Sequence, residues 1–408
     1  MKEEGLRFLF STYRDVAEGL TSDIYFYRTL KILREKGLDR VEVYAEFTPS
    51  AFPEGYKWAV FAGLRDVITL LKGKEVDLYA LPEGTVFRMK DYYGYRLPVM
   101  AIEGPYGEFV IYETPALGFL SSASGIATKA ARVKRAAGGK LVVSFGARRI
   151  HPALSPFEAY YAYIGGCDAV SCVKGAEFLG LKPVGTMPHS LLILYRAVKG
   201  DHREAWKAFD EVVEPDVPRI VLVDTFWDEA EEALEAAKLL GKRLWGVRLD
   251  TPGSRRGNFP EIIREVKWKL KAAGYDWVKI VVSGGINEYV IPELIEAGAD
   301  AFGVGSAIAN APIIDYAMDI TAVKVKGEWV PISKRGKLSG RKQVYRCWKC
   351  LVDVVKLEGE PEPKCPKCGG SMEPMLRKYL ERGKVVQEVP SPSEIRDYVL
   401  SQTRRLEL

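Results

Sequence analysis

The chain has 408 residues, enough for two or three domains with buried cores of their own. Apolar residues make up 47% and charged residues 28%, which excludes a disordered or fibrous protein. The net charge of +5 is small for this length, so composition argues against a nucleic-acid partner. Because no run reaches the ~18 apolar residues of a membrane span and the start has no secretory core, we expect a cytoplasmic protein without a membrane partner.

The numbers of cysteine, asparagine and glutamine residues indicate the redox state and the temperature at which the protein works. Six cysteines comprise two C-x-x-C pairs and the single residues Cys167 and Cys172, a pattern typical of metal binding in a reducing compartment. Asn and Gln together occur only six times. Depletion of these heat-labile amides is typical of hyperthermophiles, so we expect a thermophilic source.

Residues 1–115 predict an N-terminal α+β domain, which we expect residues 308–340 to join. A helical pattern covers Ser22–Glu35, and short β-like runs follow at 41–44 and 97–100. Glycine and proline separate these runs, so we expect antiparallel strands.

Residues 116–307 predict a β/α barrel, in which short apolar runs alternate with helical stretches. The runs are Leu141–Arg148, Ala169–Val173, Pro183–His189, Ile220–Phe226, Leu244–Asp250, Val278–Gly285 and Ala301–Ser306. They recur every ~20 to 35 residues, as parallel β/α units require. A doubly wound open sheet is the alternative, but no G-x-G-x-x-G loop follows the first strand. We therefore expect an α/β fold with an irregular barrel.

Polar residues and glycines stand at the ends of these runs, where barrel enzymes carry their chemistry. The turns Ser283-Gly284-Gly285 and Gly303-Val304-Gly305-Ser306 could close backbone N–H groups around a phosphate, although turn glycines are also common for steric reasons. The order and spacing of the two turns favour the phosphate site.

Five charged or titratable residues at strand ends have both a functional and a structural interpretation. Arg148 and Arg149 suit a carboxylate or phosphate, or form surface salt bridges. Asp224 and Asp250 could accept ribose hydroxyls or hold magnesium through water, or cap helices. His189 could act as acid, base or phosphoryl acceptor, although a lone histidine is more often a packing residue.

The cysteine pairs form the most specific pattern in the chain, Cys347-x2-Cys350-x14-Cys365-x2-Cys368. Two such pairs can enclose tetrahedral zinc and leave no open position for a catalytic water. We therefore predict that residues 341–408 form a structural zinc ribbon and a C-terminal helix that starts near Pro392.

Read together, the motifs resemble the nicotinate phosphoribosyltransferase family, in the shorter form expected in archaea. The motifs are Thr21–Phe26, Leu81–Thr85, Ile102–Pro105, Ile126–Arg132, Phe145–Arg149, the Gly185-Thr186-x-x-His189 sequence and Glu394–Arg396. The resemblance implies a type II phosphoribosyltransferase barrel and an enzyme that makes nicotinate mononucleotide and pyrophosphate from nicotinate and phosphoribosyl pyrophosphate. It also implies a homo-oligomer, at least a dimer, with shared active sites.

The resemblance assigns roles to individual residues. Phe145, and Tyr25 of a neighbouring subunit, would stack on the pyridine ring, while Arg148 and Arg149 would face the carboxylate and pyrophosphate. Asp250 would bind the ribose, and Gly284, Gly285, Gly303 and Gly305 the 5′-phosphate. His189 matches the histidine that the family phosphorylates with ATP, an energy-coupling step separate from the magnesium-assisted glycosyl transfer.

Two alternatives stay open. Gly125-Ile126-Ala127-Thr128 also resembles quinolinate phosphoribosyltransferase, the decarboxylating relative, which should carry a basic strand end where this chain has Phe145–Arg149 and should lack the motif that ends at His189. A zinc-ribbon nucleic-acid binder without turnover is the other alternative, and the intact strand-end residues speak against it.

Overall fold

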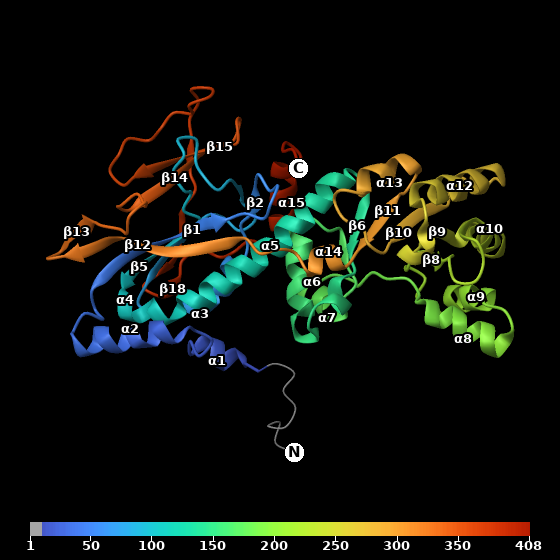
Figure 1. The fold of residues 1–408 in the computed structure, drawn as a ribbon, viewed down its shortest axis with the longest axis horizontal. Coiled ribbons are helices and arrows are strands. Elements are labelled where there is room, and N and C mark those ends of the chain that lie inside the picture. The colour runs from blue at the N-terminus through green and yellow to red at the C-terminus, as the bar shows by residue number, and fades with distance from the viewer. Residues whose placement is uncertain (1–9) are drawn as a thin grey trace, which may run out of the picture. The chain divides into compact units, whose positions relative to one another are not determined.

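The computed structural model describes residues 10–408 as two compact units. Unit 1 holds the described residues up to Thr128 together with Pro312–Glu407, and unit 2 holds Lys129–Ala311 (Figure 1). The chain thus leaves unit 1, builds unit 2 and returns. Residues 341–407 of the expected C-terminal part group with unit 1.

A seven-stranded antiparallel sheet forms the centre of unit 1, in the order β13-β12-β1-β5-β3-β17-β18. Its strands are β1 Glu42–Ala51, β3 Asp77–Ala80, β5 Met100–Pro105, β12 Asp315–Val325, β13 Glu328–Pro331, β17 Arg377–Glu381 and β18 Lys384–Val385. The early strands β1, β5 and β3 lie in the middle, strands from the end of the chain flank them on both edges, and Figure 1 shows β12 lying along β1. The predicted antiparallel strands are therefore confirmed, with more partners from the end of the chain than expected.

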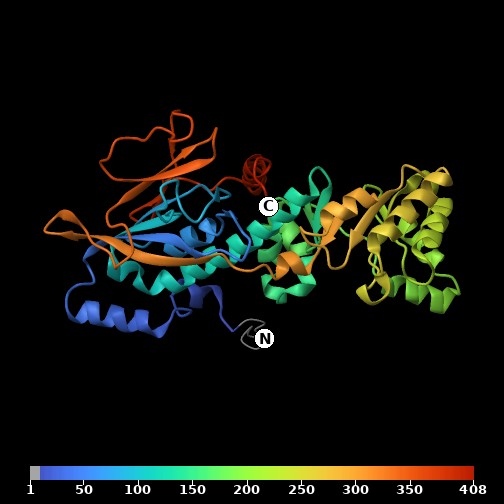
Figure 2. The same ribbon diagram turned by 45° about the horizontal axis from the view of Figure 1, so that its top comes forward.

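Both faces of β1 are buried. Val43, Ala45 and Phe47 point into the main core, while Tyr44 packs with Ala101 and other residues on the opposite face. Figure 2 shows α2 on one side of the sheet and the β14–β15 hairpin on the other. The returning segment is part of the same core, to which it adds Tyr316, Met318 and Tyr379. Each fully buried large side chain contributes about 1.5–3 kcal/mol.

The remaining elements of unit 1 are short, apart from α5, which the two units share. They are α1 Tyr13–Ala17, α2 Ile24–Glu35, α3 Leu64–Leu71, α4 Tyr106–Phe109, α5 Glu113–Ala137, α15 Pro392–Thr403, β2 Ala59–Val60, β4 Val86–Phe87, β14 Lys342–Cys347, β15 Val352–Leu357 and β16 Glu373–Pro374. Helix α2 confirms the predicted helix. The last helix begins as predicted, with Ser391 as N-cap, Pro392 in the first turn and a capping box closed by Glu394.

Unit 2 is built on a six-stranded parallel sheet in the order β7-β6-β11-β10-β9-β8. Its strands are β6 Leu141–Ser144, β7 Ala169–Val170, β8 Arg219–Leu222, β9 Leu244–Leu249, β10 Lys279–Ser283 and β11 Ala301–Val304. Its helices are α6 Ser155–Ile164, α7 Val173–Leu179, α8 His189–Lys199, α9 Arg203–Val212, α10 Glu229–Leu240, α11 Gly253–Arg256, α12 Phe259–Ala272, α13 Ile291–Ala297 and α14 Ser306–Ala309. Helices α10, α12 and α13 lie in a row beside the sheet (Figure 1).

One predicted strand is wrong, and the predicted barrel is open. Residues Pro183–His189 form no strand, because Pro183 and Pro188 have no N–H to donate to a neighbouring strand. A single ladder-like bond, from Val184 N to Val170 O at 3.0 Å, anchors this segment. In the described residues β7 and β8 are the unpaired edges of the sheet, which is therefore a curled half-barrel.

None of the helices in residues 10–408 is both long and apolar enough to cross a membrane.

Helix α3 depends on a side chain from elsewhere in unit 1 for its N-terminal cap. Its N-cap residue, Gly63, has φ of 101° and no side chain to offer. The buried Glu83 accepts hydrogen bonds from Gly63 N at 2.7 Å and Arg65 N at 3.1 Å. Burial raises the pKa of Glu83 to about 7.

Replacement of Glu83 by Ala should therefore lower the free energy of unfolding by about 2–4 kcal/mol, because two N–H groups lose their partner and a cavity forms. Denaturant unfolding measures this difference. The exposed Glu54→Ala should stay within about 0.5 kcal/mol of the parent. A Glu83→Ala protein as stable as this control would show that the cap is dispensable.

Candidate active site

A cleft at the carboxyl edge of the unit 2 sheet gathers most of the predicted residues. Its cavity has a volume of about 550 Å³. Ten residues singled out from the sequence line it: Phe145, Arg148, Arg149, His189, Asp250, Ser283, Gly284, Gly285, Gly303 and Gly305. Five separate loops contribute them, because the ends of parallel strands meet at one edge.

The turn after β10 requires its glycines. Gly284 and Gly285 have φ of 83° and 69°, a left-handed conformation that other residues rarely adopt. Arg256 holds the turn by donating to Gly284 O at 2.8 Å and Ser283 O at 3.1 Å. A Cβ on Gly284 would lie 2.8 Å from the Arg256 guanidinium and 3.0 Å from Asp250 Oδ1, so the turn has no space for a side chain at this position.

The glycines after β11 make room for an aromatic ring. A Cβ on Gly303 would lie 2.2 Å from the ring of Phe145, and one on Gly305 would lie 3.1 Å from Phe145 O. Any side chain at 303 would displace Phe145. The structure therefore gives Gly303 a steric role that its place in a glycine-rich turn did not reveal.

Arg148 and Arg149 follow β6 in a short 3-10 turn, Gly146–Arg149, and both are exposed. Neither forms an ion pair with an acidic side chain anywhere in residues 10–408, so the interpretation as surface salt bridges finds no support. Behind the turn, the buried Glu158 accepts from Ser144 Oγ at 2.7 Å, and burial raises its pKa to about 7. The two guanidinium groups remain available for an anionic ligand.

Arg248 is a third cation of the cleft that sequence reasoning missed. It lies on β9 two residues before Asp250, a spacing that puts both side chains on one face of a strand and could have identified it. It donates to Met187 O at 3.0 Å, while its buried Nε has no hydrogen-bond partner. Burial lowers the pKa of Arg248 from its usual value.

His189 is the first residue of α8 and is enclosed by polar groups on two sides. Its Nδ1 lies 3.2 Å from Thr225 Oγ1 and 3.7 Å from Asp224 Oδ1. Its Nε2 lies 3.9 Å from Asp250 Oδ2, too far for a direct hydrogen bond. Burial lowers the pKa of His189 more than Asp250 raises it, so the imidazole is neutral near pH 7 and has a lone pair to donate.

Asp224 and Asp250 have different positions. Asp250 lines the cleft, and its Oδ1 accepts from Ser283 Oγ at 2.8 Å. The Asp224 side chain is 1% exposed and accepts from Asp250 N at 2.6 Å. Burial raises the pKa of Asp224 to about 7. Asp224 lies behind His189 and outside the cleft lining, so its predicted contact with substrate stays a prediction.

Tyr25, predicted to stack on the ring from a neighbouring subunit, lies on α2 of unit 1 with 55% of its surface exposed. An exposed aromatic ring is available to another subunit, and that role stays a prediction.

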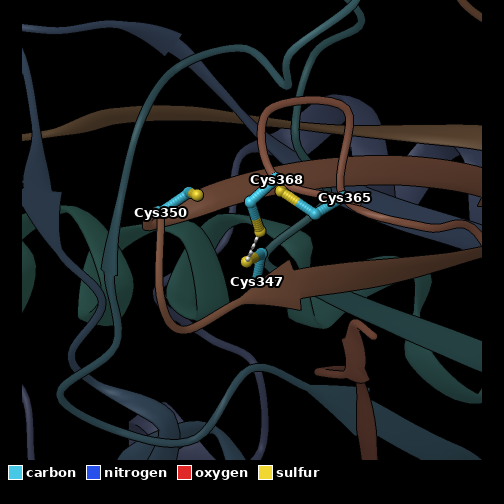
Figure 3. Close-up of side chains that lie close together, drawn as sticks. All are labelled: Cys347, Cys350, Cys365 and Cys368. Atoms are coloured by element: carbon cyan, nitrogen blue, oxygen red, sulfur yellow. Dashed lines mark hydrogen bonds between the residues drawn. The ribbon is translucent and has the colours of Figure 1, made fainter. Parts of the chain in front are cut away.

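The four cysteines of the predicted ribbon come together in unit 1 (Figure 3). All four Sγ atoms lie within 4.8 Å of one another, and those of Cys347 and Cys368 are 3.7 Å apart. Tetrahedral zinc with bonds of ~2.3 Å would place its sulfurs about 3.8 Å apart, so the donor set fits this metal. Among the described residues no other group of three or more metal-binding side chains is this close.

Two family models match the chain. The quinolinate phosphoribosyl transferase C-terminal domain matches residues 126–319, and the N-terminal domain of the same family matches residues 23–124. A nicotinate phosphoribosyltransferase of Mycobacterium tuberculosis is 31% identical over 337 residues, which cover 80% of this chain and 68% of that protein. The Bacillus subtilis nicotinate phosphoribosyltransferase is 28% identical, with 82% and 74% covered.

The similar solved structures carry two different names. A nicotinate-nucleotide pyrophosphorylase from Pyrococcus furiosus is 51% identical with a TM-score of 0.92, and the match covers 99% of this chain and 100% of that one. Human nicotinic acid phosphoribosyltransferase shares the fold, with a TM-score of 0.72 at 22% identity over 94% of each chain. The chain therefore belongs to the nicotinate phosphoribosyltransferase family, with the two domains of the quinolinate phosphoribosyl transferase models.

Proposed function

We propose that the protein transfers the phosphoribosyl group of phosphoribosyl pyrophosphate to nicotinate, in NAD salvage. The observation that carries this proposal is the composition of the cleft, which combines an aromatic ring, two arginines without acidic partners, one carboxylate and a bare glycine turn. A flat anion, a ribose and several phosphates are the ligands that such a set binds.

Each group of the cleft has a task in this reaction. Phe145 supports the pyridine ring, and Arg148 or Arg149 pairs with its carboxylate or with the departing pyrophosphate. Asp250 accepts the ribose hydroxyls through Oδ2, since its Oδ1 is bonded to Ser283. The turn at Gly284 and Gly285 binds the 5′-phosphate. Holding both reactants in line accounts for much of the catalysis expected at an oxocarbenium-like carbon.

Magnesium would supply charge neutralisation for the pyrophosphate. Asp250 is the only carboxylate among the residues that line the cleft, so protein ligands alone make no magnesium cage there. This fits an ion that keeps several waters and binds mainly to phosphate oxygens, with Asp250 holding one of those waters.

His189 is the proposed acceptor of a phosphoryl group from ATP. Its imidazole is neutral, and Nε2 has no hydrogen-bond partner within 3.5 Å in the described residues, whereas Nδ1 contacts Thr225. Nucleophilic attack of a ring nitrogen on the γ-phosphorus releases ADP and leaves a phosphoramidate, whose hydrolysis drives product formation.

Quinolinate phosphoribosyltransferase is the second candidate, because both matching family models bear that name. Arg248 adds a third cation to the cleft, which a substrate with two carboxylates could use. The exposed 3-10 turn with Phe145 and the presence of His189 favour nicotinate. No observation favours the nucleic-acid alternative.

The cysteine cluster is proposed to hold structural zinc, which ties the β14–β15 hairpin to the loop that carries Cys365 and Cys368.

We also propose at least a dimer, in which Tyr25 reaches the cleft of a partner.

The choice between nicotinate and nicotinamide should depend on the carboxylate that only nicotinate has. Nicotinate should be used roughly a hundredfold better than nicotinamide in kcat/KM, since a charge-assisted pair is worth ~2–3 kcal/mol. Steady-state assays of Arg148→Gln and Arg149→Gln identify the residue involved, with Arg264→Gln, a surface ion pair on α12, as control. Equal use of both substrates would contradict the proposal, and turnover of quinolinate with release of carbon dioxide would establish the second candidate.

ATP coupling should require His189. His189→Ala should abolish ATP hydrolysis and ATP stimulation while slow ATP-independent synthesis of nicotinate mononucleotide survives, because the histidine has no role at the anomeric carbon. ADP release and mononucleotide formation are measured together at equal folded fraction, with the exposed His151→Ala as control. ATP hydrolysis by the His189→Ala protein would reject the assignment.

Zinc should be present at one ion per chain in purified protein, and Cys347→Ser should lower the thermal midpoint while the surviving protein keeps its kcat. Elemental analysis and thermal melts measure both effects. Cys172→Ser, which removes a cysteine of unit 2, should change neither. A Cys347→Ser protein that is stable but inactive would show that zinc has a role beyond structure.

A further inference from the structure

A buried carboxylate organises the turn that follows β8. The Glu232 side chain is fully buried on α10 and accepts three backbone hydrogen bonds from consecutive residues of the turn. Thr225 N lies 3.2 Å from Oε2, and Phe226 N and Trp227 N lie 2.9 and 3.0 Å from Oε1. Three N–H donors on one carboxylate fix the path of the turn.

Capping of the helix does not account for this arrangement. Asp228 is already the N-cap of α10, and its Oδ1 accepts from Ala230 N at 2.9 Å. Glu232 therefore acts on the turn before the helix and not on the helix start. A residue that only stabilised α10 would have no reason to accept hydrogen bonds from three N–H groups of the turn before the helix.

The far side of Glu232 is closed by a second buried group. His202 Nε2 lies 3.1 Å from Glu232 Oε1 as an electrostatic contact without the alignment of a hydrogen bond. The imidazole is fully buried between Trp206, Phe226 and Trp227, with ring centroids 4.7–5.3 Å away. The Glu232 carboxylate is thus enclosed by the three N–H groups of the turn on one side and by His202 on the other.

The turn reaches His189 through Thr225. Thr225 Oγ1 lies 3.2 Å from Nδ1 of His189, which belongs to a different element, α8. The unpaired Asp224 Oδ1 lies 3.7 Å from the same nitrogen. With the ring proton on Nδ1, Thr225 Oγ1 accepts a hydrogen bond from it and the Nε2 lone pair stays free.

We propose that Glu232 is a positioning residue for His189. Its carboxylate holds the backbone of Thr225, and the threonine hydroxyl in turn keeps the imidazole in its Nδ1–H tautomer with Nε2 available. That this tautomer matters for catalysis rests on the proposed phosphoryl transfer to His189. The presence of the tautomer can be tested without that proposal.

The test reads the imidazole directly. The chain has three histidines, so nitrogen-15 NMR of histidine-labelled protein gives few signals, and His189→Ala identifies those of His189. The parent should show one dominant Nδ1–H tautomer. Glu232→Gln, which replaces one acceptor oxygen by a donor, and Thr225→Val, which keeps the shape but removes Oγ1, should both move the two resonances toward the average of mixed tautomers.

Two further variants separate positioning from general damage. Thr225→Ser keeps a hydroxyl and should restore the parent spectrum, and Glu231→Gln, a largely exposed neighbour on α10, should not change it. Unchanged His189 resonances in Glu232→Gln, or in Thr225→Val if Glu232→Gln does not fold, would overturn the proposal.

A kinetic measurement distinguishes this proposal from the function it deepens. Thr225→Val should lower kcat for ATP hydrolysis at least about tenfold with KM for ATP unchanged, and Thr225→Ser should recover it. If the parent hydrolyses no ATP, the proposed coupling fails while the NMR result still decides the role of Glu232. Loss of ATP hydrolysis in Thr225→Val that Thr225→Ser does not recover would count against the hydroxyl contact.

Discussion

The parallel arrangement of the unit 2 strands is the constraint on which the candidate site depends. Parallel strands end at one edge, about 4.8 Å from their neighbours, so residues distant in sequence come within reach of one small ligand. Arg148 after β6, Asp250 after β9 and the glycine turn after β10 meet in this way. Apart from the irregular segment 181–188 that leads to His189, the geometry of the site follows from the packing of the sheet.

Charge is divided between the cleft and the layer behind it. Arg148, Arg149 and Arg248 line the cleft with Asp250 as the only acid. Other acids, including Glu158 and Glu232, are buried and accept hydrogen bonds from a hydroxyl or from backbone N–H groups. The cleft is thereby left positive, which suits polyanionic substrates, while Glu158 lies behind the turn that carries the arginines and Glu232 holds the turn that contacts His189.

Much of this could be predicted from the sequence, because strand ends, glycine turns and cysteine spacing are local patterns. The parallel β/α succession, ten cleft residues and the cysteine cluster are all present in the structure. Contacts between distant segments could not be predicted in the same way. Glu232 appeared as an ordinary helix residue, Arg248 was overlooked within a strand, and the return of β17 into the unit 1 sheet has no local signal. The apolar run from Pro183 suggested a strand, but the segment forms none because its prolines cannot donate to a neighbouring strand.

A crystal structure of the protein with nicotinate mononucleotide tests the central claim most directly. The account predicts the product in the unit 2 cleft, with the pyridine ring on Phe145, ribose hydroxyls on Asp250 and the phosphate at the backbone of Gly284 and Gly285. Its carboxylate should lie on an arginine guanidinium. Product bound outside this cleft, or in it with the phosphate away from the glycine turn, would contradict the account.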